Sequence, residues 1–357
     1  MPKRTWPLPF RYGSDPDLNK TMAQKRLALV FAAALFVGNG VEASNCALRN
    51  PQRQIYELFP EATNYRTVSG NVDIAAKRRI EAQIGRELEF SDLGKSTVCI
   101  VLKENVPIGF VHARAEVGVR GTTELVWALD LNMRVLQTRV QRSRERHADV
   151  LRSEAFSRLL VGRDWLSLRD LLDTETLALE ADSLELPEHS HALAAVAVYS
   201  GVKTTVILEC GFANIVWTAR VEGHVARFFP DAKDITVPPR AVDEATRTRA
   251  QEWLGWAPVE VDPDSVKVVR AVGKAGESLG LLVHAHWRRS DPIELWIALQ
   301  PDGHLDEVLS WDEGEAHEDL AALQGLSMDE LRDRKEPAAR FVAEVLALLR
   351  SGGVGLD

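Results

Sequence analysis

The residues best suited to holding an anion form one short run, Ser200-Gly201 followed by Lys203, Thr204 and Thr205. A glycine allows backbone N–H groups to approach a phosphate closely, and neighbouring hydroxyl groups and a helix N-terminus complete such a site. Lys203 would place a positive charge beside the phosphate. The same run also fits a plain Ser-Gly turn within an apolar segment, with no ligand.

Three pairs of histidines are the other candidates for a functional site: His284 with His286, His147 with His317, and His189 with His191. His284 and His286 alternate along an expected strand, so both point to one face, but no third ligand is visible. The other two pairs fit a solvated helix start and an exposed linker. The sequence therefore predicts no metal site, and no nucleophile, triad or phosphate-binding glycine loop indicates hydrolase chemistry.

An internal duplication positions these residues. Leu58-Phe59-Pro60-Glu61-Ala62 recurs 170 residues later as Phe228-Phe229-Pro230-Asp231-Ala232. The run from Glu124 to Leu129 and the run from Glu294 to Leu299 keep the same offset. Matches that hold one register over a hundred residues predict two tandem copies of one domain, at residues 50–215 and 222–350.

Each copy has the pattern of an α+β domain. A helix ending on glycine is expected at residues 72–85 and 243–255. Short apolar strands follow, at residues 97–102, 109–116, 123–129 and 135–140 in copy one and at 266–272, 280–286, 293–299 and 305–309 in copy two. Helical stretches at residues 146–172 and 337–349 complete the copies. The fold class predicted is two antiparallel sheets, each with helices packed against one face.

The N-terminal sequence indicates an exported protein. Lys25 and Arg26 precede an apolar run of about 14 residues, short of the roughly 20 that span a bilayer. Small residues allow cleavage after Ala43, so residues 1–43 are expected to be an extension and signal peptide, with an uncleaved anchor or a lipid on Cys46 as the alternatives.

The net charge of −9 argues against a nucleic-acid partner. Three scattered cysteines without a CxxC argue against haem, iron–sulfur and cysteine–zinc sites.

The chain resembles the FMN-binding domain of the periplasmic subunits of the sodium-translocating quinone reductase and the Rnf complex. The opening aromatic-Pro-acidic-Ala turn, the Pro107-Ile108-Gly109 strand and the helix motif at residues 156–163 occur in the family's order. The resemblance covers residues 55–215 and, without the family's signature, 225–350.

The family's signature D-x-x-S-G-A-T-x-T falls on residues 197–205. Ser200, Gly201 and Thr205 match it, whereas Ala197, Val202 and Lys203 depart from it. The resemblance implies that Ser200, Gly201, Lys203, Thr204 and Thr205 bind FMN, either non-covalently or through a phosphodiester on Thr205 made by a flavin transferase. It also implies that Glu145 lies near the isoalloxazine.

Two functions follow from these observations. The first is an exported electron carrier with one FMN on copy one, serving membrane-associated redox partners, in which the protein positions and tunes the flavin. The second keeps the fold without the cofactor, as an exported interaction or structural protein. The three signature positions that differ, and the absence of the signature from copy two, favour the cofactor-free protein. The signature residues that are retained, Ser200, Gly201 and Thr205, favour the FMN electron carrier.

Overall fold

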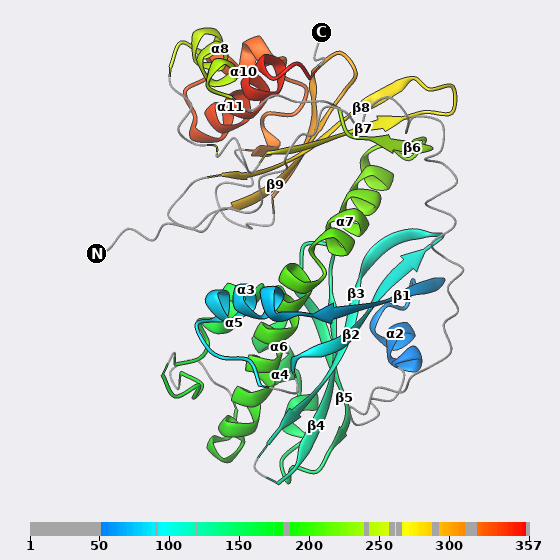
Figure 1. Ribbon diagram of the computed structural model, residues 1–357, viewed down its shortest axis with the longest axis vertical. Coiled ribbons are helices and arrows are strands. Elements are labelled where there is room, and N and C mark those ends of the chain that lie inside the picture. The colour runs from blue at the N-terminus through cyan, green and yellow to red at the C-terminus, as the bar shows by residue number, and fades with distance from the viewer. Residues whose placement is uncertain are drawn as a thin grey trace. The chain divides into compact units, whose positions relative to one another are not determined.

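The computed structural model describes residues 51–357 apart from 90–91, 119, 174, 181–185, 239–242, 257–260, 262–265, 288–292, 311–319 and 355–357. Its ribbon is shown in Figure 1. The expected signal peptide, its cleavage point after Ala43 and Cys46 lie outside the described residues.

Copy one is built on a five-stranded antiparallel meander in the order β1-β2-β3-β4-β5. Its strands are β1 (Asn64–Val72), β2 (Gly94–Lys103), β3 (Val106–Val117), β4 (Thr122–Leu129) and β5 (Val135–Ser143). The strands β2, β3 and β4 contain runs of consecutive buried residues, which point alternately to the two faces, so both faces of the sheet must be covered.

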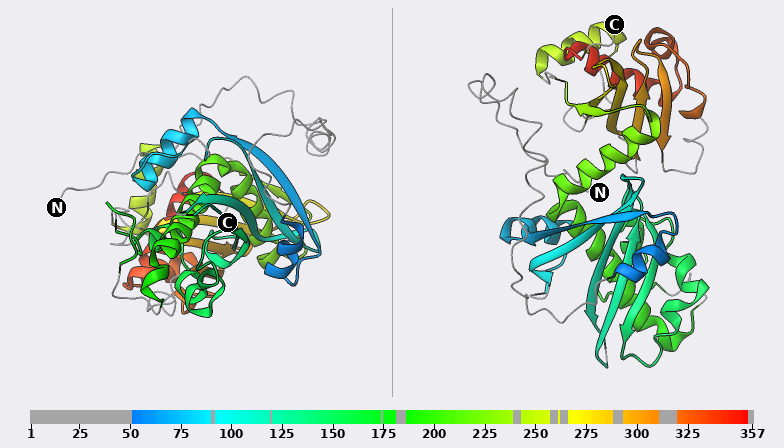
Figure 2. Two further views of the ribbon diagram at one scale, coloured as in Figure 1. Left: turned by 90° about the horizontal axis from the view of Figure 1, so that it is seen from below. Right: turned by 90° about the vertical axis from the view of Figure 1, so that its right-hand side faces the viewer.

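Helices cover the two faces of this sheet unequally. On one face lie α3 (Ile74–Ile84), α4 (Glu154–Leu160), α5 (Trp165–Arg169) and the long α6 (His191–Gly211), around the core residues Ile80, Trp127, Phe156, Leu168 and Val202. On the other face α2 (Gln52–Leu58) packs through Ile55 and Leu58 against Val111 and Val126. Figure 2 shows α2 and α6 on opposite sides of the sheet.

Copy two repeats this plan. Its sheet has the order β10-β9-β8-β7-β6, from β6 (Asp234–Thr236), β7 (Lys267–Val272), β8 (Ser278–Trp287), β9 (Ile293–Leu299) and β10 (Leu305–Ser310). The helices α8 (Glu244–Leu254), α10 (Met328–Asp333) and α11 (Pro337–Ser351) share a core with one face. The C-terminal half of α7 (Ala213–Phe228) packs on the other face, as α2 does in copy one.

Equivalent glycines are required for the same reason in both copies. A Cβ at Gly109 would lie 2.5 Å from the Leu129 carbonyl oxygen and 2.7 Å from the Phe59 ring. A Cβ at Gly280 would lie 2.3 Å from the Leu299 carbonyl oxygen and 2.5 Å from the Phe229 ring. The phenylalanine of each opening turn therefore packs directly on the strand backbone, and only glycine, which has no Cβ, leaves room for it.

The α+β class and the two antiparallel sheets are confirmed. Three details differ from the sequence prediction. Each sheet has a further edge strand, β1 or β6, straight after the opening turn. The stretch at 146–172 is not one helix, since Gly162 takes a positive φ of 81° between α4 and α5. Each sheet also carries a helix on its second face.

Candidate functional site

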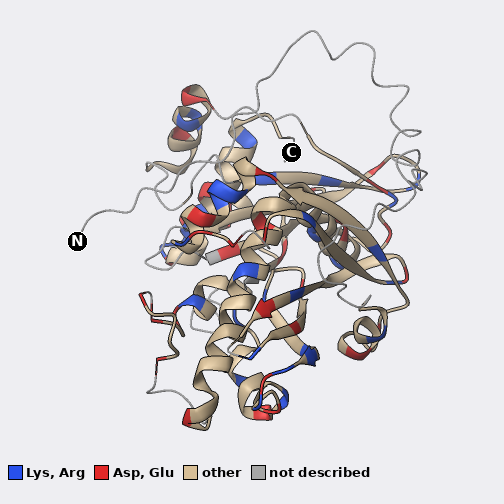
Figure 3. Cartoon of the chain, turned by 60° about the horizontal axis from the view of Figure 1, so that its bottom comes forward, with Lys and Arg blue, Asp and Glu red and all other residues tan. Residues whose placement is uncertain are grey.

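The residues expected to bind FMN phosphate lie in the middle of α6, and the Ser-Gly turn expected there is continuous helix. Ser200, Gly201, Thr204 and Thr205 are fully buried, and Lys203 is 2% exposed. Mid-helix amides are bonded to carbonyls one turn earlier, so none is available to an anion. The helix carries only two charged residues, Lys203 and Glu209, and its ribbon is accordingly almost all tan in Figure 3.

Packing against β4 explains why these small residues are present. A Cβ at Gly201 would lie 2.7 Å from the Trp127 ring, so glycine lets the indole reach the helix. The Trp127 Nε1–H donates to Ser200 Oγ at 3.2 Å. Thr205 Oγ1 donates to the Gly201 carbonyl at 3.1 Å, which satisfies the hydroxyl inside its own helix.

Lys203 belongs to a buried network of two cations and two carboxylates. Its Nζ lies 2.7 Å from Glu116 Oε2 and 3.4 Å from Asp92 Oδ2. Arg114 Nε lies 3.0 Å from Glu116, and the Arg114 guanidinium also pairs with Asp92. Arg114 and Glu116 are two apart on β3, so both point toward α6. The charge of Lys203 is thus already balanced.

As folded, these residues do not fit a flavin phosphate. The hydroxyls point into packed core, the amides are paired, and the cation is neutralised. Glu145 takes no part in this cluster: its carboxylate accepts a hydrogen bond from the Arg120 amide at 2.6 Å, at the turn between β3 and β4. Among the described residues Glu145 forms hydrogen bonds with Arg120 and Ser143, and neither residue belongs to α6.

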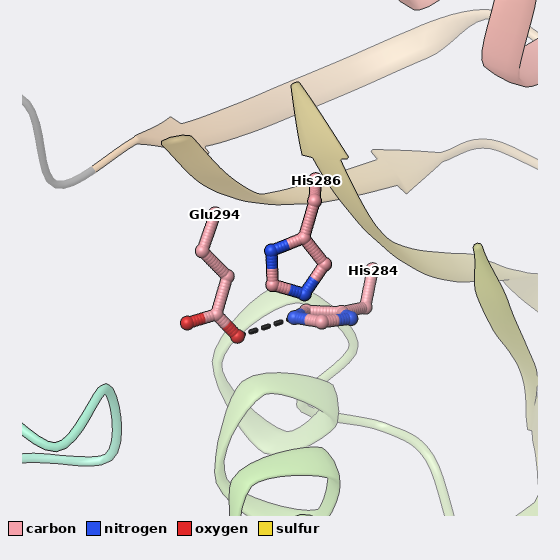
Figure 4. A group of neighbouring side chains, drawn as sticks. All are labelled: His284, His286 and Glu294. Atoms are coloured by element: carbon pink, nitrogen blue, oxygen red, sulfur yellow. Dashed lines mark hydrogen bonds and ion pairs between the residues drawn. The ribbon is translucent and has the colours of Figure 1, made fainter. Parts of the chain in front are cut away.

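A different group of side chains converges on the second sheet. His284 and His286 project from β8 and Glu294 from β9, and their candidate ligand atoms all lie within 4.8 Å of one another (Figure 4). Register explains the convergence, because His286 is paired directly with Glu294 across the two strands. His284 is two residues earlier on the same face. His284 is buried and His286 exposed, so the group opens to solvent.

Glu294 is held as a carboxylate. Its carboxyl group contacts His284 Nε2 and the Arg220 guanidinium from α7. Burial acts to raise the pKa of Glu294, but Arg220 and then His284 outweigh it and hold that pKa well below its usual value. Burial lowers the pKa of His284 to about 4 despite the neighbouring Glu294, so the imidazole is neutral at pH 7.

The donor set is one that transition metals use. Two imidazoles and a carboxylate are ligands for zinc and for other late divalent ions, whereas calcium and magnesium take oxygen ligands. Ligands sharing one tetrahedral zinc are separated by roughly 3.3 Å, given bonds of about 2.05 Å. His284 Nε2 and the Glu294 oxygen lie closer together than this spacing, and no pair of the three ligand atoms is more than 4.8 Å apart, so side-chain rotations alone would be needed to reach it, with a fourth position left open.

Sequence reasoning placed His284 and His286 on one face but did not identify Glu294 as the third ligand. The signal was available in the expected strands, since β8 and β9 are consecutive and antiparallel neighbours pair across their hairpin. Only the register was lacking. Among the other histidines, the His147 and His189 rings lie 4.2 Å apart. His191 Nε2 bonds the Leu186 carbonyl at 2.9 Å, and His317 lies outside the described residues.

One helix of the described part, Glu188–Gly211, is long and apolar enough to cross a membrane, but 72% of its most apolar window is buried. It includes α6 and is accounted for as a core helix.

No protein-family model and no curated protein matches the chain. The resemblance to FMN-binding domains stays a prediction from the residues that carry it.

Proposed function

We propose that the protein binds a divalent transition-metal ion of the zinc class through His284, His286 and Glu294. The observation that carries the proposal is the convergence of these three ligand atoms within 4.8 Å on adjacent strands. The proposed function uses no flavin, because the matching residues on α6 are packed into the core. Exported location remains part of the proposal, on the strength of the apolar run near the N-terminus.

The openness of the site argues for an ion that exchanges with solvent. Structural zinc sites are closed by four protein ligands, whereas sites with three protein ligands keep a position for water or another ligand. His286 lies at the solvent side of the group, so an ion can enter without unfolding of the sheet. Such a site suits uptake, transfer or Lewis-acid use of the ion.

The test is calorimetric titration of metal-free protein with Zn²⁺, together with Co²⁺ titration followed by the visible spectrum. We expect one ion per chain. His286→Ala should weaken binding by roughly 100-fold or more, since even loss of a partner behind a ligand costs 10–100-fold. His286 is exposed, so its removal leaves the core intact.

His304→Ala supplies the matched control, because His304 is on the same copy, is partly exposed and is not a member of the group. It should bind Zn²⁺ as tightly as the unaltered protein. Zn²⁺ binding that is absent from the unaltered chain, or equal in His286→Ala and the control, would refute the proposal.

A further inference from the structure

Arg220 connects the proposed metal site with copy one. It lies on α7, and its Nη2 donates both to Glu294 Oε1 of copy two and to Asn132 Oδ1 of copy one, the latter at 3.4 Å. Glu294 Oε1 is also the oxygen that contacts His284 Nε2. An ion held by His284 and Glu294 must therefore share a carboxylate that Arg220 already uses.

A buried guanidinium that loses a carboxylate needs another acceptor. Arg220 is 8% exposed, so water can replace Glu294 only in part. Its Nε already has no hydrogen-bond partner among the described residues. An unpaired buried charge is strongly unfavourable. In the described part of the chain, Asn132 Oδ1 is the second acceptor that contacts this guanidinium.

The turn that carries Asn132 is held firmly. It joins β4 to β5, and Asp130 Oδ1 accepts the backbone N–H groups of Asn132 at 2.8 Å and of Arg134 at 2.9 Å. Met133 takes a positive φ of 65°, and its buried side chain belongs to the core of copy one. A non-glycine residue in this region costs free energy, which the surrounding packing must offset. Asn132 is therefore presented from a fixed backbone.

The same turn approaches α7 closely. A Cβ at Gly223, about one helical turn after Arg220, would lie 2.7 Å from the Pro107 carbonyl oxygen and would overlap the Leu131 side chain. Only glycine therefore lets the helix pack against the start of β3 and the turn after β4. Both copies belong to one compact unit of the chain. The contact between Asn132 and Arg220 is part of this packing.

We propose that Asn132 is a positioning residue for the metal site: it holds Arg220 when an ion takes Glu294, and copy one thereby sets the ion affinity of copy two. The inference rests on the proposed function and adds to it a residue that does not itself contact the ion. At 3.4 Å the Asn132 bond is long while Glu294 also holds Arg220, and it can shorten once the ion has taken the carboxylate. A bond that is stronger in the ion-bound state favours binding.

The test is calorimetric Zn²⁺ titration of the full chain with substitutions at Asn132. Asn132→Ala removes the acceptor and should weaken binding about fivefold, the effect of about one hydrogen bond. Asn132→Asp places a carboxylate at the same position and should tighten binding about fivefold, since a charged acceptor bonds a guanidinium more strongly. A disturbance of packing would weaken binding in both variants, so opposite signs are specific to the proposed role.

Two further variants keep the result specific. Arg220→Met removes the group through which Asn132 acts, so in that background both substitutions of Asn132 should change the Zn²⁺ affinity by less than about twofold. Asn105→Asp adds the same charge at an exposed position of the turn between β2 and β3 and should leave the affinity unchanged. Thermal melts establish that each variant is folded. If Asn132→Ala does not fold, Asn132→Asp measured against Asn105→Asp decides the question.

The outcomes separate this inference from the metal site itself. Zn²⁺ affinities that are unchanged in both Asn132 variants, or that shift in the same direction, overturn the inference and leave the metal site in place. A shift that persists in the Arg220→Met background also overturns it, because Asn132 would then act without Arg220. Absence of Zn²⁺ binding by the unaltered chain overturns both proposals.

Discussion

Lys203 shows how one residue type can be consistent with two environments. In the sequence it stands beside Ser-Gly and two threonines, as a phosphate-binding lysine would. In the fold its partner Glu116 lies 87 residues away along the chain, and the indole that bonds Ser200 lies 73 residues away. The residues next to Lys203 in the sequence give no information about either partner. The burial of the run from Ser200 to Thr205 therefore could not be predicted from the local sequence.

Removing one member of the buried network should be costly. We expect Lys203→Met to lower the free energy of unfolding by about 3–5 kcal/mol, because Asp92 and Glu116 would then share only Arg114. Urea denaturation at pH 7 measures the change. Lys95→Met, at an exposed position of β2, should stay within about 0.5 kcal/mol of the unaltered protein. Equal stability of the two variants would show that the network contributes nothing.

His112 should make stability depend on acid pH. Burial, then Arg114, lowers the pKa of His112 to about 4, whereas an unfolded histidine titrates near 6.5. Its contribution is complete above pH 6.5 and is lost as the pH falls toward 4, since the unfolded chain then binds the proton more readily.

His112→Asn isolates this effect, because the amide can replace the ring nitrogen that bonds the Thr97 carbonyl at 2.8 Å. Between pH 6.5 and 4.5 the unaltered protein should lose roughly 2 kcal/mol more stability than His112→Asn. Chemical denaturation at the two pH values gives the difference. Parallel losses in both proteins would contradict the assignment.

At the scale of elements, the hairpin of β8 and β9 makes the metal group. Its two strands were predictable from their apolar runs, but a slip of one residue in register would turn Glu294 to the opposite face. The edge strand β1 was missed because most of its residues are exposed, and it lacks the apolar alternation of a half-buried strand. Hydrophobic periodicity predicts strands that bury one face. The register of a strand cannot be predicted without knowing how its partner strand is aligned with it.

Helix α7 contributes a cation that competes with a metal ion for Glu294. Arg220 pairs with Glu294 and lies over the Trp296 ring at 5.4 Å. Two cations that compete for one carboxylate weaken each other reciprocally, typically by 1–3 kcal/mol. Arg220→Met should therefore tighten Zn²⁺ binding by about tenfold, measured by calorimetry alongside a thermal melt. Weaker or unchanged binding in a folded variant would show that Arg220 is not a competitor.

At the scale of the whole molecule, the polar side chains of β3 in copy one and of its counterpart β8 in copy two point to opposite faces of their sheets. In copy one, Arg114 and Glu116 face the helices. In copy two, His284 and His286 face the other way, at the positions of Ala113 and Ala115. Glu124 of copy one is the counterpart of Glu294 and is paired with Ala115, as Glu294 is with His286.

This correspondence can be tested by building the missing site. Ala113→His combined with Ala115→His should give copy one a second His-His-Glu group with Glu124, at the register seen in copy two. Calorimetry should then report two Zn²⁺ ions per chain in place of one. Ala113→Asn with Ala115→Asn serves as a control of similar polarity. A stoichiometry that stays at one would mean that equivalent register does not suffice.

The helix α7 also determines where this chain can be divided. Val216 and Ala219 in its first half belong to the first core, and Val221 and Val225 in its second half cover the second sheet. A break before α7 would leave α7 on copy two and remove Val216 and Ala219 from the core of copy one. A break after it would leave copy one carrying an apolar stripe with nothing to pack on. The two repeats therefore share one structural element, and division of the chain on either side of α7 would expose apolar residues that are buried in the intact protein.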